Sequence, residues 1–234
     1  MEFMLLFLVH KDAPPPEPAG FAEMGAFAAE LARQGKLRRG APLTDASEAA
    51  RIRVRDGNAL VTDGPFAESK EVVAGFWVID VASRAEAIDI ARRTPHARDG
   101  VVEVHHMRAR YGVADNGAGT PFILLFRMEP GLKPDDAKLR AMINYGQALE
   151  REGKQFETAP LAHDLPPARI EGRGGKTLVT DGPFAEAKEG VGGYSLVRVA
   201  DRAAAIDLAR HYPHATWGPV EVREIQFFDD VSVG

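Results

Sequence analysis

An internal repeat that runs without gaps limits what this chain can fold into more than any other feature of the sequence. The segment Leu60–Met107 returns as Leu178–Ile225 at a constant shift of about 118 residues, and about 29 of the roughly 48 paired positions are identical. The same shift relates Pro42 to Pro160. Because this period is far longer than one solenoid unit, it indicates a duplicated domain.

The repeat predicts a domain at 1–115, a linker at 116–119 and a second domain at 120–234. The chain has 234 residues, of which 45% are hydrophobic and 27% are charged, a composition typical of globular proteins. Its length allows each half to bury a core. The linker sequence Asn-Gly-Ala-Gly is of the kind that connects domains without regular structure.

Composition and charge exclude several classes of protein. The chain contains no cysteine, which excludes a disulfide scaffold, a catalytic thiol and cysteine-ligated metal sites, and we expect neither a cofactor nor a bound metal. The net charge of −5 is spread over both halves, so we expect no nucleic-acid partner. The longest apolar run, Phe3–Val9, is too short to cross a bilayer, so we expect a cytoplasmic protein without a membrane partner.

Hydrophobic periodicity predicts the order of elements within copy one. It reads as a strand, a helix, a short strand, a hairpin, a further strand, a helix with a capping box and a last strand, at 4–9, 21–34, 37–43, 51–62, 75–81, 84–93 and 101–107. The hairpin turn is predicted at Asp56-Gly57. This order is a split βαβ pattern, which predicts an α+β fold of two ferredoxin-like domains.

The expected helices would cover one face of each sheet and leave the other face open. Two copies in one chain can bury these open faces against each other. We therefore predict an intramolecular pseudo-dimer that forms an α/β barrel, and a further homo-oligomer is compatible with this arrangement.

The run Thr62–Glu68, which reads Thr-Asp-Gly-Pro-Phe-Ala-Glu, closely resembles the DGPF-motif branch of the YCII-related family, and Lys70, Glu71 and Gly75 extend the resemblance. Both copies carry the motif. The resemblance implies a ferredoxin-like domain that pairs into a dimeric α/β barrel, with no single activity attached to it. It also implies an association of some members with extracytoplasmic-function sigma factors.

For the short prototype members of this family, the resemblance implies a catalytic histidine and aspartate near the first helix. The corresponding helix positions here are Met24 and Ala32 in copy one, and Met142 and Glu150 in copy two. That catalytic pair is therefore not carried over to this chain.

The aspartates of the motif, Asp63 and Asp181, are candidate catalytic residues. Aspartate in such a turn also accepts backbone N–H bonds, so a structural role is the alternative. The glycines that follow, Gly64 and Gly182, are expected at positive φ.

Two further pairs of residues match between the copies and complete the catalytic candidates. His96 and His214 each follow a proline at a helix end, where each is a surface histidine near the helix C-terminus, a general acid or base, or a metal ligand, the last being disfavoured because no second ligand lies at a recognisable spacing. Glu103 and Glu221 alternate with valines in the last strand. They are ordinary surface residues if that face meets solvent, and buried carboxylates if it meets the other half.

Charged residues that follow the motif are candidate ligand-binding residues, with a solvated salt-bridge cluster as the alternative. They are Glu68, Lys70 and Glu71 in copy one and Glu186, Lys188 and Glu189 in copy two.

Arginines alternate along the first strand of the hairpin in copy one, at Arg51, Arg53 and Arg55, whereas copy two has Glu171 in the middle position. These arginines form either an anion-binding strip or a charged edge that opposes aggregation.

The sequence supports three functions of different classes. The first is a small-molecule-binding module, a sensor or accessory protein, because a barrel provides a cavity and no complete catalytic set is visible. The second is a cofactor-free acid–base enzyme, a hydrolase or lyase acting on a polar small molecule. The third is an interaction partner within a sigma-factor regulatory system.

Overall fold

The computed structural model describes residues 1–14, 17–129, 132–162, 165–173, 176–182, 184 and 190–226 of the chain. These residues form a mixed α+β fold with four α-helices and two antiparallel sheets. In the first half the elements are β1 (Glu2–His10), α1 (Pro18–Arg33), β2 (Leu37–Pro42), β3 (Ala50–Arg55), β4 (Asn58–Asp63), β5 (Glu71–Asp80), α2 (Arg84–Arg93) and β6 (Val101–His106).

The second half repeats this order. Its elements are β8 (Thr120–Met128), α3 (Asp136–Arg151), β9 (Gln155–Pro160), β10 (Ala168–Arg173), β11 (Lys176–Asp181), β12 (Gly190–Val199), α4 (Arg202–His211) and β13 (Val220–Glu224). The short strand β7 (Tyr111–Gly112) precedes residues 116–119, which are exposed and lie outside helices and strands.

Local sequence signals account for the ends of several elements. Helix α1 ends before Gly35, whose φ of 67° suits the left-handed conformation that closes a helix. Asp56 and Gly57, with φ values of 50° and 76°, form the turn between β3 and β4, as the sequence predicts. The Ser83 hydroxyl accepts the Glu86 backbone N–H and begins α2.

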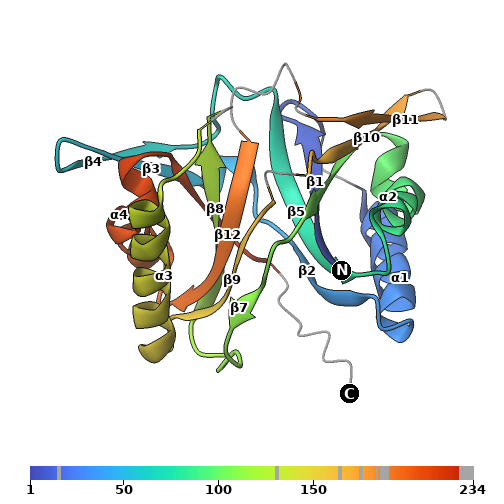
Figure 1. Cartoon of the computed structure of the whole chain (residues 1–234). Helices are drawn as coiled ribbons and strands as arrows, with labels where there is room; N and C mark the ends of the chain where they lie inside the picture. The colour runs from blue at the N-terminus through green and yellow to red at the C-terminus, as the bar shows by residue number, and fades with distance from the viewer. Residues whose placement is uncertain are drawn as a thin grey trace.

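Each sheet contains a hairpin from the other half of the chain. The six-stranded sheet has the order β11-β10-β6-β1-β5-β2, and the seven-stranded sheet has the order β4-β3-β13-β8-β12-β9-β7. Ile52 of β3 lies opposite Val220 of β13, and Ile170 of β10 lies opposite Val102 of β6. Figure 1 shows the exchange: hairpin β3–β4 extends over α4 of the second half, and hairpin β10–β11 extends over α2 of the first.

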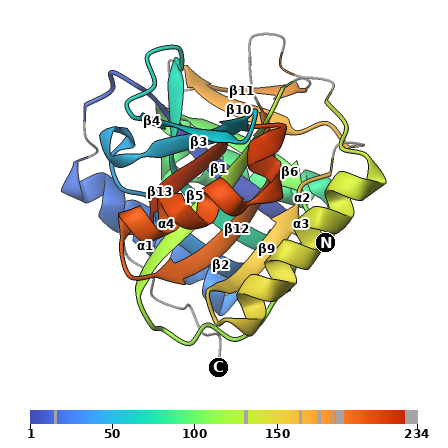
Figure 2. The same ribbon diagram turned by 90° about the vertical axis from the view of Figure 1, so that its left-hand side faces the viewer.

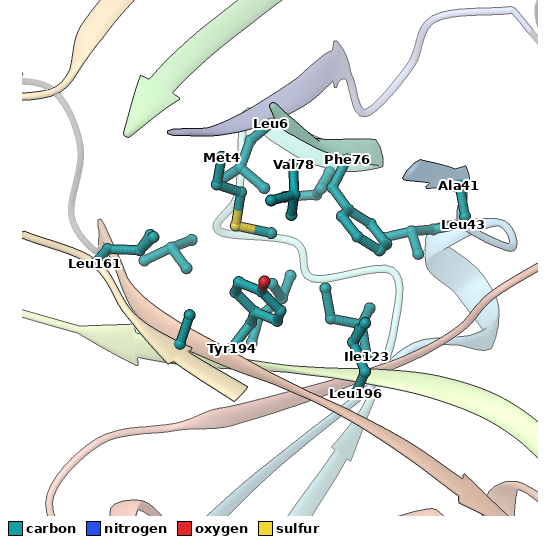
Figure 3. Close-up of a cluster of buried hydrophobic side chains, with 14 of the residues drawn as sticks. Met4, Leu6, Ala41, Leu43, Phe76, Val78, Ile123, Leu161, Tyr194 and Leu196 are labelled. Carbon is teal, nitrogen blue, oxygen red and sulfur yellow. The ribbon is translucent and has the colours of Figure 1, made fainter. Parts of the chain in front are cut away.

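A hydrophobic core fills the space between the two sheets and draws on both halves. Met4 and Phe76 from the first half meet Ile123 and Tyr194 from the second in this layer (Figure 3). The helices cover the opposite faces of the sheets, and Figure 2 shows α3 and α4 lying across the outer face of the seven-stranded sheet. The expectation that the two open sheet faces bury each other agrees with this core.

Two isolated bridges connect the sheets near their edges. Leu43, which follows β2, pairs with Ile225, which follows β13. Met107, which follows β6, pairs with Leu161, which follows β9. The first half therefore touches the second through backbone hydrogen bonds at both of these places.

The glycines of the motif are required for a different reason from the one expected. Neither Gly64 nor Gly182 has positive φ, so the expectation of a left-handed turn residue is wrong. A Cβ atom on Gly64 would lie 1.9 Å from the carbonyl oxygen of Ala46, whereas on Gly182 it would lie 3.1 Å from the ring of Pro167. Close approach of the backbone, and not a special φ, excludes a side chain at Gly64.

This packing predicts that Gly64→Ala lowers the free energy of unfolding by about 1–3 kcal/mol, because the added methyl group meets backbone that has little room to move. Urea denaturation followed by circular dichroism measures the effect. Gly25→Ala is the matched control, since a Cβ at Gly25 meets nothing within 4 Å and the residue lies in α1. Equal stability of the Gly64 variant and the wild type would contradict this account.

Candidate functional site between the two halves

The exchanged hairpins bring one arginine from each half onto a glutamate of the other half. Arg51 of β3 lies opposite Glu221 of β13, and its Nε donates to Glu221 Oε2 at 3.1 Å. In the pseudo-equivalent place Arg169 lies opposite Glu103 of β6, and its Nη1 donates to Glu103 Oε1 at 3.4 Å. The valines on either side of each glutamate belong to the hydrophobic clusters between a sheet and its helices. The glutamates therefore point the other way, into the space between the sheets.

Glu221 is fully buried among three arginines. Arg127 Nε donates to its Oε2 at 3.0 Å, and Arg223 Nη1 lies 3.5 Å from its Oε1. Burial alone would raise the pKa of Glu221, but Arg127, Arg223 and Arg51 outweigh it and lower the pKa to about 2. This carboxylate is therefore ionised at neutral pH and serves as the anchor for the arginines.

Glu103 has a less positive environment than its counterpart. Its Oε2 lies 2.9 Å from His105 Nε2. Arg169, which donates to Glu103, also donates from its Nη2 to Glu71 Oε1 at 2.5 Å. Burial would raise the pKa of Glu103, yet His105, Arg169 and Arg127 lower it. The two clusters share the arginine–glutamate pair and differ in the groups around it.

The motif segments place an aromatic ring against each of these arginines. Phe66 is buried, and the Arg51 guanidinium lies 3.9 Å from the centre of its ring. The Phe184 ring centre lies 6.0 Å from the Arg169 guanidinium. Glu68 also reaches Arg51, with 3.1 Å between Oε1 and Nη1. The motif thus holds in place the arginine that crosses between the halves.

Asp63 and Asp181 form a second reciprocal set of contacts between the halves. The Asp63 carboxylate accepts a hydrogen bond from Arg202 at the start of α4, and Asp181 accepts one from Arg84 at the start of α2, each at 2.5 Å. Both aspartates are exposed. These contacts are structural, since they connect each hairpin to the opposite helix, but they are made to arginine side chains and not to the backbone N–H groups expected of an aspartate in a turn.

The two matched histidines lie inside the fold. His214 is buried, and its Nε2 lies 2.8 Å from the Arg127 carbonyl oxygen, while His96 Nε2 lies 2.9 Å from the Leu8 carbonyl oxygen. Burial lowers the pKa of His96, and it lowers the pKa of His214 to about 4. The interpretation as a surface histidine at a helix end is therefore wrong for His214, which is buried, whereas His96 is half-buried.

The remaining ligand-binding candidates do not form one cluster among the described residues. Lys70 is exposed, and Glu71 joins the Glu103 cluster through Arg169. Glu186, Lys188 and Glu189 lie outside the described residues. The structure therefore brings together Glu68 with Glu221, and Glu71 with Glu103, each pair through one arginine.

The sequence comparison of the two halves missed Arg127, Arg223 and His105 because these positions differ between the copies. The shift places Val9 opposite Arg127 in the alignment, and His105 opposite Arg223. The alternation of β13 was the available signal, since Glu221 and Arg223 share a face of that strand.

A surface hollow of about 230 Å³ opens beside the Glu221 cluster. Its lining consists of the exchanged hairpin, the motif and one residue of the second half: Arg51, Arg53, Arg55, Leu60, Thr62, Phe66, Glu68 and Pro219. A second hollow of about 270 Å³ lies between α3 and α4 and includes Tyr145, Asp207 and His211.

Within the described ranges, no three histidine, aspartate or glutamate side chains form a cluster that could hold a metal ion. Over the same ranges, no helix is both long enough and apolar enough to span a bilayer.

Comparison with known proteins assigns the family of this duplicated α+β chain. The model of the YCII-related domain matches twice, at residues 1–108 and 120–229. The chain therefore belongs to the YCII-related family and contains a tandem duplication of its domain.

Two further comparisons give one curated protein and one solved structure. A protein of Rhizobium meliloti (strain 1021), described as uncharacterized, is 41% identical over 75 residues, which are 32% of this chain and 60% of that protein. The chain thus matches less than two thirds of that relative's length. A solved structure described as an anthrone oxidase-like protein has a TM-score of 0.39 and 9% identity, over 99% of this chain and 94% of that chain.

The buried carboxylate predicts a particular loss of stability in acid. Because the pKa of Glu221 is lowered from 4.5 to about 2, its contribution is complete above pH 4.5 and is lost as the pH falls towards 2. We expect Glu221→Gln to unfold more easily at neutral pH, by about 3–5 kcal/mol, and to lose this part of the pH dependence.

Denaturant titrations between pH 2 and 7 measure this effect. Glu68→Gln is the control, because it removes an exposed partner of the same arginine and should cost less than about 1 kcal/mol. An acid transition of Glu221→Gln that follows the wild-type curve would refute the assignment.

Proposed function

We propose that this protein binds a small anionic molecule in the hollow formed by the first-half hairpin. The observation that carries the proposal is the alignment of Arg51, Arg53 and Arg55 on one face of β3, with all three lining the hollow. A row of guanidinium groups beside a concave surface is suited to carboxylate or phosphate groups, which arginine binds in a bidentate manner.

The register of the hairpin explains why this face is also partly apolar. Thr62 lies opposite Arg51, and Leu60 lies opposite Arg53. Leu60 is among the most exposed large apolar residues of the described chain, at 60% exposure. With Phe66 it gives the hollow an apolar wall beside its cationic one, so the favoured ligand is a small carboxylate or phosphate that carries an apolar group.

The hollow is smaller than the cavities of about 300–1,000 Å³ that hold drug-sized ligands. Its volume of about 230 Å³ therefore suits a small metabolite. Arg51 already contacts Glu221 and Glu68, and Arg53 contacts Glu129, which leaves Arg55 as the most exposed of the three guanidinium groups. We expect the ligand to engage Arg53 and Arg55 first.

The second half carries the opposite charge at the central position of its hairpin. Glu171 corresponds to Arg53 and would repel an anion. We therefore propose one anion site per chain, in the first half, while the second half completes the structure that supports it.

We also propose that the sheets form a pseudo-dimeric α/β barrel, with ferredoxin-like domains at 1–115 and 120–234. The bridges Leu43–Ile225 and Met107–Leu161 support closure, since each joins the end of a strand in one sheet to the end of a strand in the other. Eight strands, four from each half, would then surround the apolar core.

An acid–base enzyme is the second candidate, and the Glu103–His105 pair favours it. A carboxylate at 2.9 Å from an imidazole nitrogen is the arrangement that orients a general base. The other catalytic candidates support it less, because Glu221 is held by arginines and the matched histidines bond to backbone carbonyls. A role beside a sigma factor stays a prediction.

The proposal predicts that benzoate or phenyl phosphate binds to the wild-type protein, whereas neutral benzyl alcohol does not. Arg53→Glu should weaken binding at least tenfold, which corresponds to about 1.4 kcal/mol, because it places a carboxylate at the centre of the cationic wall. Isothermal titration calorimetry at low salt measures both results.

Arg140→Glu is the matched control, since it changes the net charge equally on the exposed surface of α3, away from the hollow. Binding reduced equally by both substitutions would mean that overall charge, and not this hollow, attracts the anion. Consumption of the probe with loss after His105→Asn would favour the enzyme instead.

A further inference from the structure

Two residues that occupy equivalent positions in the two halves touch each other. The shift of the repeat relates Arg39 of β2 to Glu157 of β9, and Arg39 Nε donates to Glu157 Oε2 at 3.0 Å. When two positions related by a pseudo-two-fold rotation are in contact, they lie on either side of its axis. A symmetric pair made from two copies of the same half would therefore bring identical side chains together there.

The pair is buried enough for its charges to matter. The exposed fraction is 18% for the Arg39 side chain and 3% for Glu157. Two like charges brought together at such a site lose their counter-charge as well as their solvent, and one uncompensated buried charge already destabilises strongly. Pairing of a first half with another first half, or of a second half with another second half, is therefore disfavoured.

A second difference between the halves lies beside the Arg39–Glu157 pair and is consistent with its charges. Tyr194 corresponds to Phe76, and the two rings lie 6.3 Å apart across the core. The Tyr194 hydroxyl donates to Glu157 Oε1 at 2.6 Å, which gives the buried carboxylate a further donor besides Arg39 and Arg110. In the first half the equivalent ring is Phe76, which has no hydroxyl, and the charged residue equivalent to Glu157 is Arg39. An arginine side chain has no acceptor atom, so it gains nothing from a hydroxyl donor.

Two reciprocal sets of charged contacts between the halves lack this asymmetry. Arg51–Glu221 and Arg169–Glu103 are equivalent to each other, and so are the pairs Asp63–Arg202 and Asp181–Arg84. Such reciprocal pairs would form equally well between two identical halves. They hold the halves together without selecting which halves meet.

We propose that Arg39 and Glu157 select the partner of each half, so that a first half accepts only a second half across this interface. The first half of a chain then pairs with the second half. Association of two chains through two first halves, or through two second halves, is disfavoured. The surface around the pseudo-two-fold axis is thus a selective interface, and this role is independent of ligand binding.

Two full-length variants with complementary charges test the proposal. Arg39→Glu places two carboxylates at the contact, and Glu157→Arg places two guanidinium groups there. Within either chain like charges then face each other, with Arg110 remaining beside them, whereas between the two variants opposite charges meet. After joint unfolding and refolding, we expect the mixture to contain about tenfold more two-chain species than either variant refolded alone, as size exclusion with light scattering would show.

Matched variants separate this selection from a general effect of charge reversal. Glu23→Arg and Arg98→Glu reverse an exposed ion pair within the first half, so their mixture should remain single-chain. The double variant Arg39→Glu/Glu157→Arg restores opposite charges within one chain and should also be single-chain, which covers the case in which a single variant does not fold alone. A complementary mixture without two-chain species, or a double variant that associates, would overturn the proposal.

Discussion

The exchange of hairpins between the two halves is the constraint on which the rest of this structure depends. Strand β3 has its own hairpin partner on one side, but on the other side it hydrogen-bonds to β13, which belongs to the second half. Strand β10 makes the reciprocal pairing with β6. Neither sheet is complete without residues of both halves, so the duplicated chain is bound together through its backbone as well as through its core.

The exchange also determines where the charged residues meet. It places Arg51 and Arg169 opposite Glu221 and Glu103, and it carries the motif aspartates to the helices of the other half. These charged residues, which recur in both copies, therefore join the copies. Residues that differ, such as Arg53 against Glu171 and Arg39 against Glu157, are where we infer ligand binding and partner selection.

The sequence was sufficient to predict the order of strands and helices, the hairpin turn at Asp56-Gly57 and the burial of two sheet faces against each other. It did not reveal the exchange, because β13 and β6 present the same Val-Glu-Val sequence and β3 would meet similar side chains on either. The alternation of valine and glutamate in the last strand of each half predicts that Glu103 and Glu221 face either solvent or the other half, and the structure shows the second alternative. The burial of His214 does not follow from the sequence, because it depends on how the turn after α4 packs against residues that are distant in the chain, such as Arg127.

A cross-link between the halves is the most direct test of the exchange. Because the chain contains no cysteine, only the introduced cysteines can form a disulfide. Cysteines at Ile52 and Val220, which lie opposite each other, should form a disulfide in the monomeric protein, because directly opposed antiparallel positions have Cα separations that permit one. The matched pair is Ile52→Cys with Val102→Cys, which would link β3 to the equivalent strand of its own half. The account predicts loss of free thiols and a mobility shift on a non-reducing gel for the first pair alone. A disulfide that forms in the second pair and not in the first would contradict it.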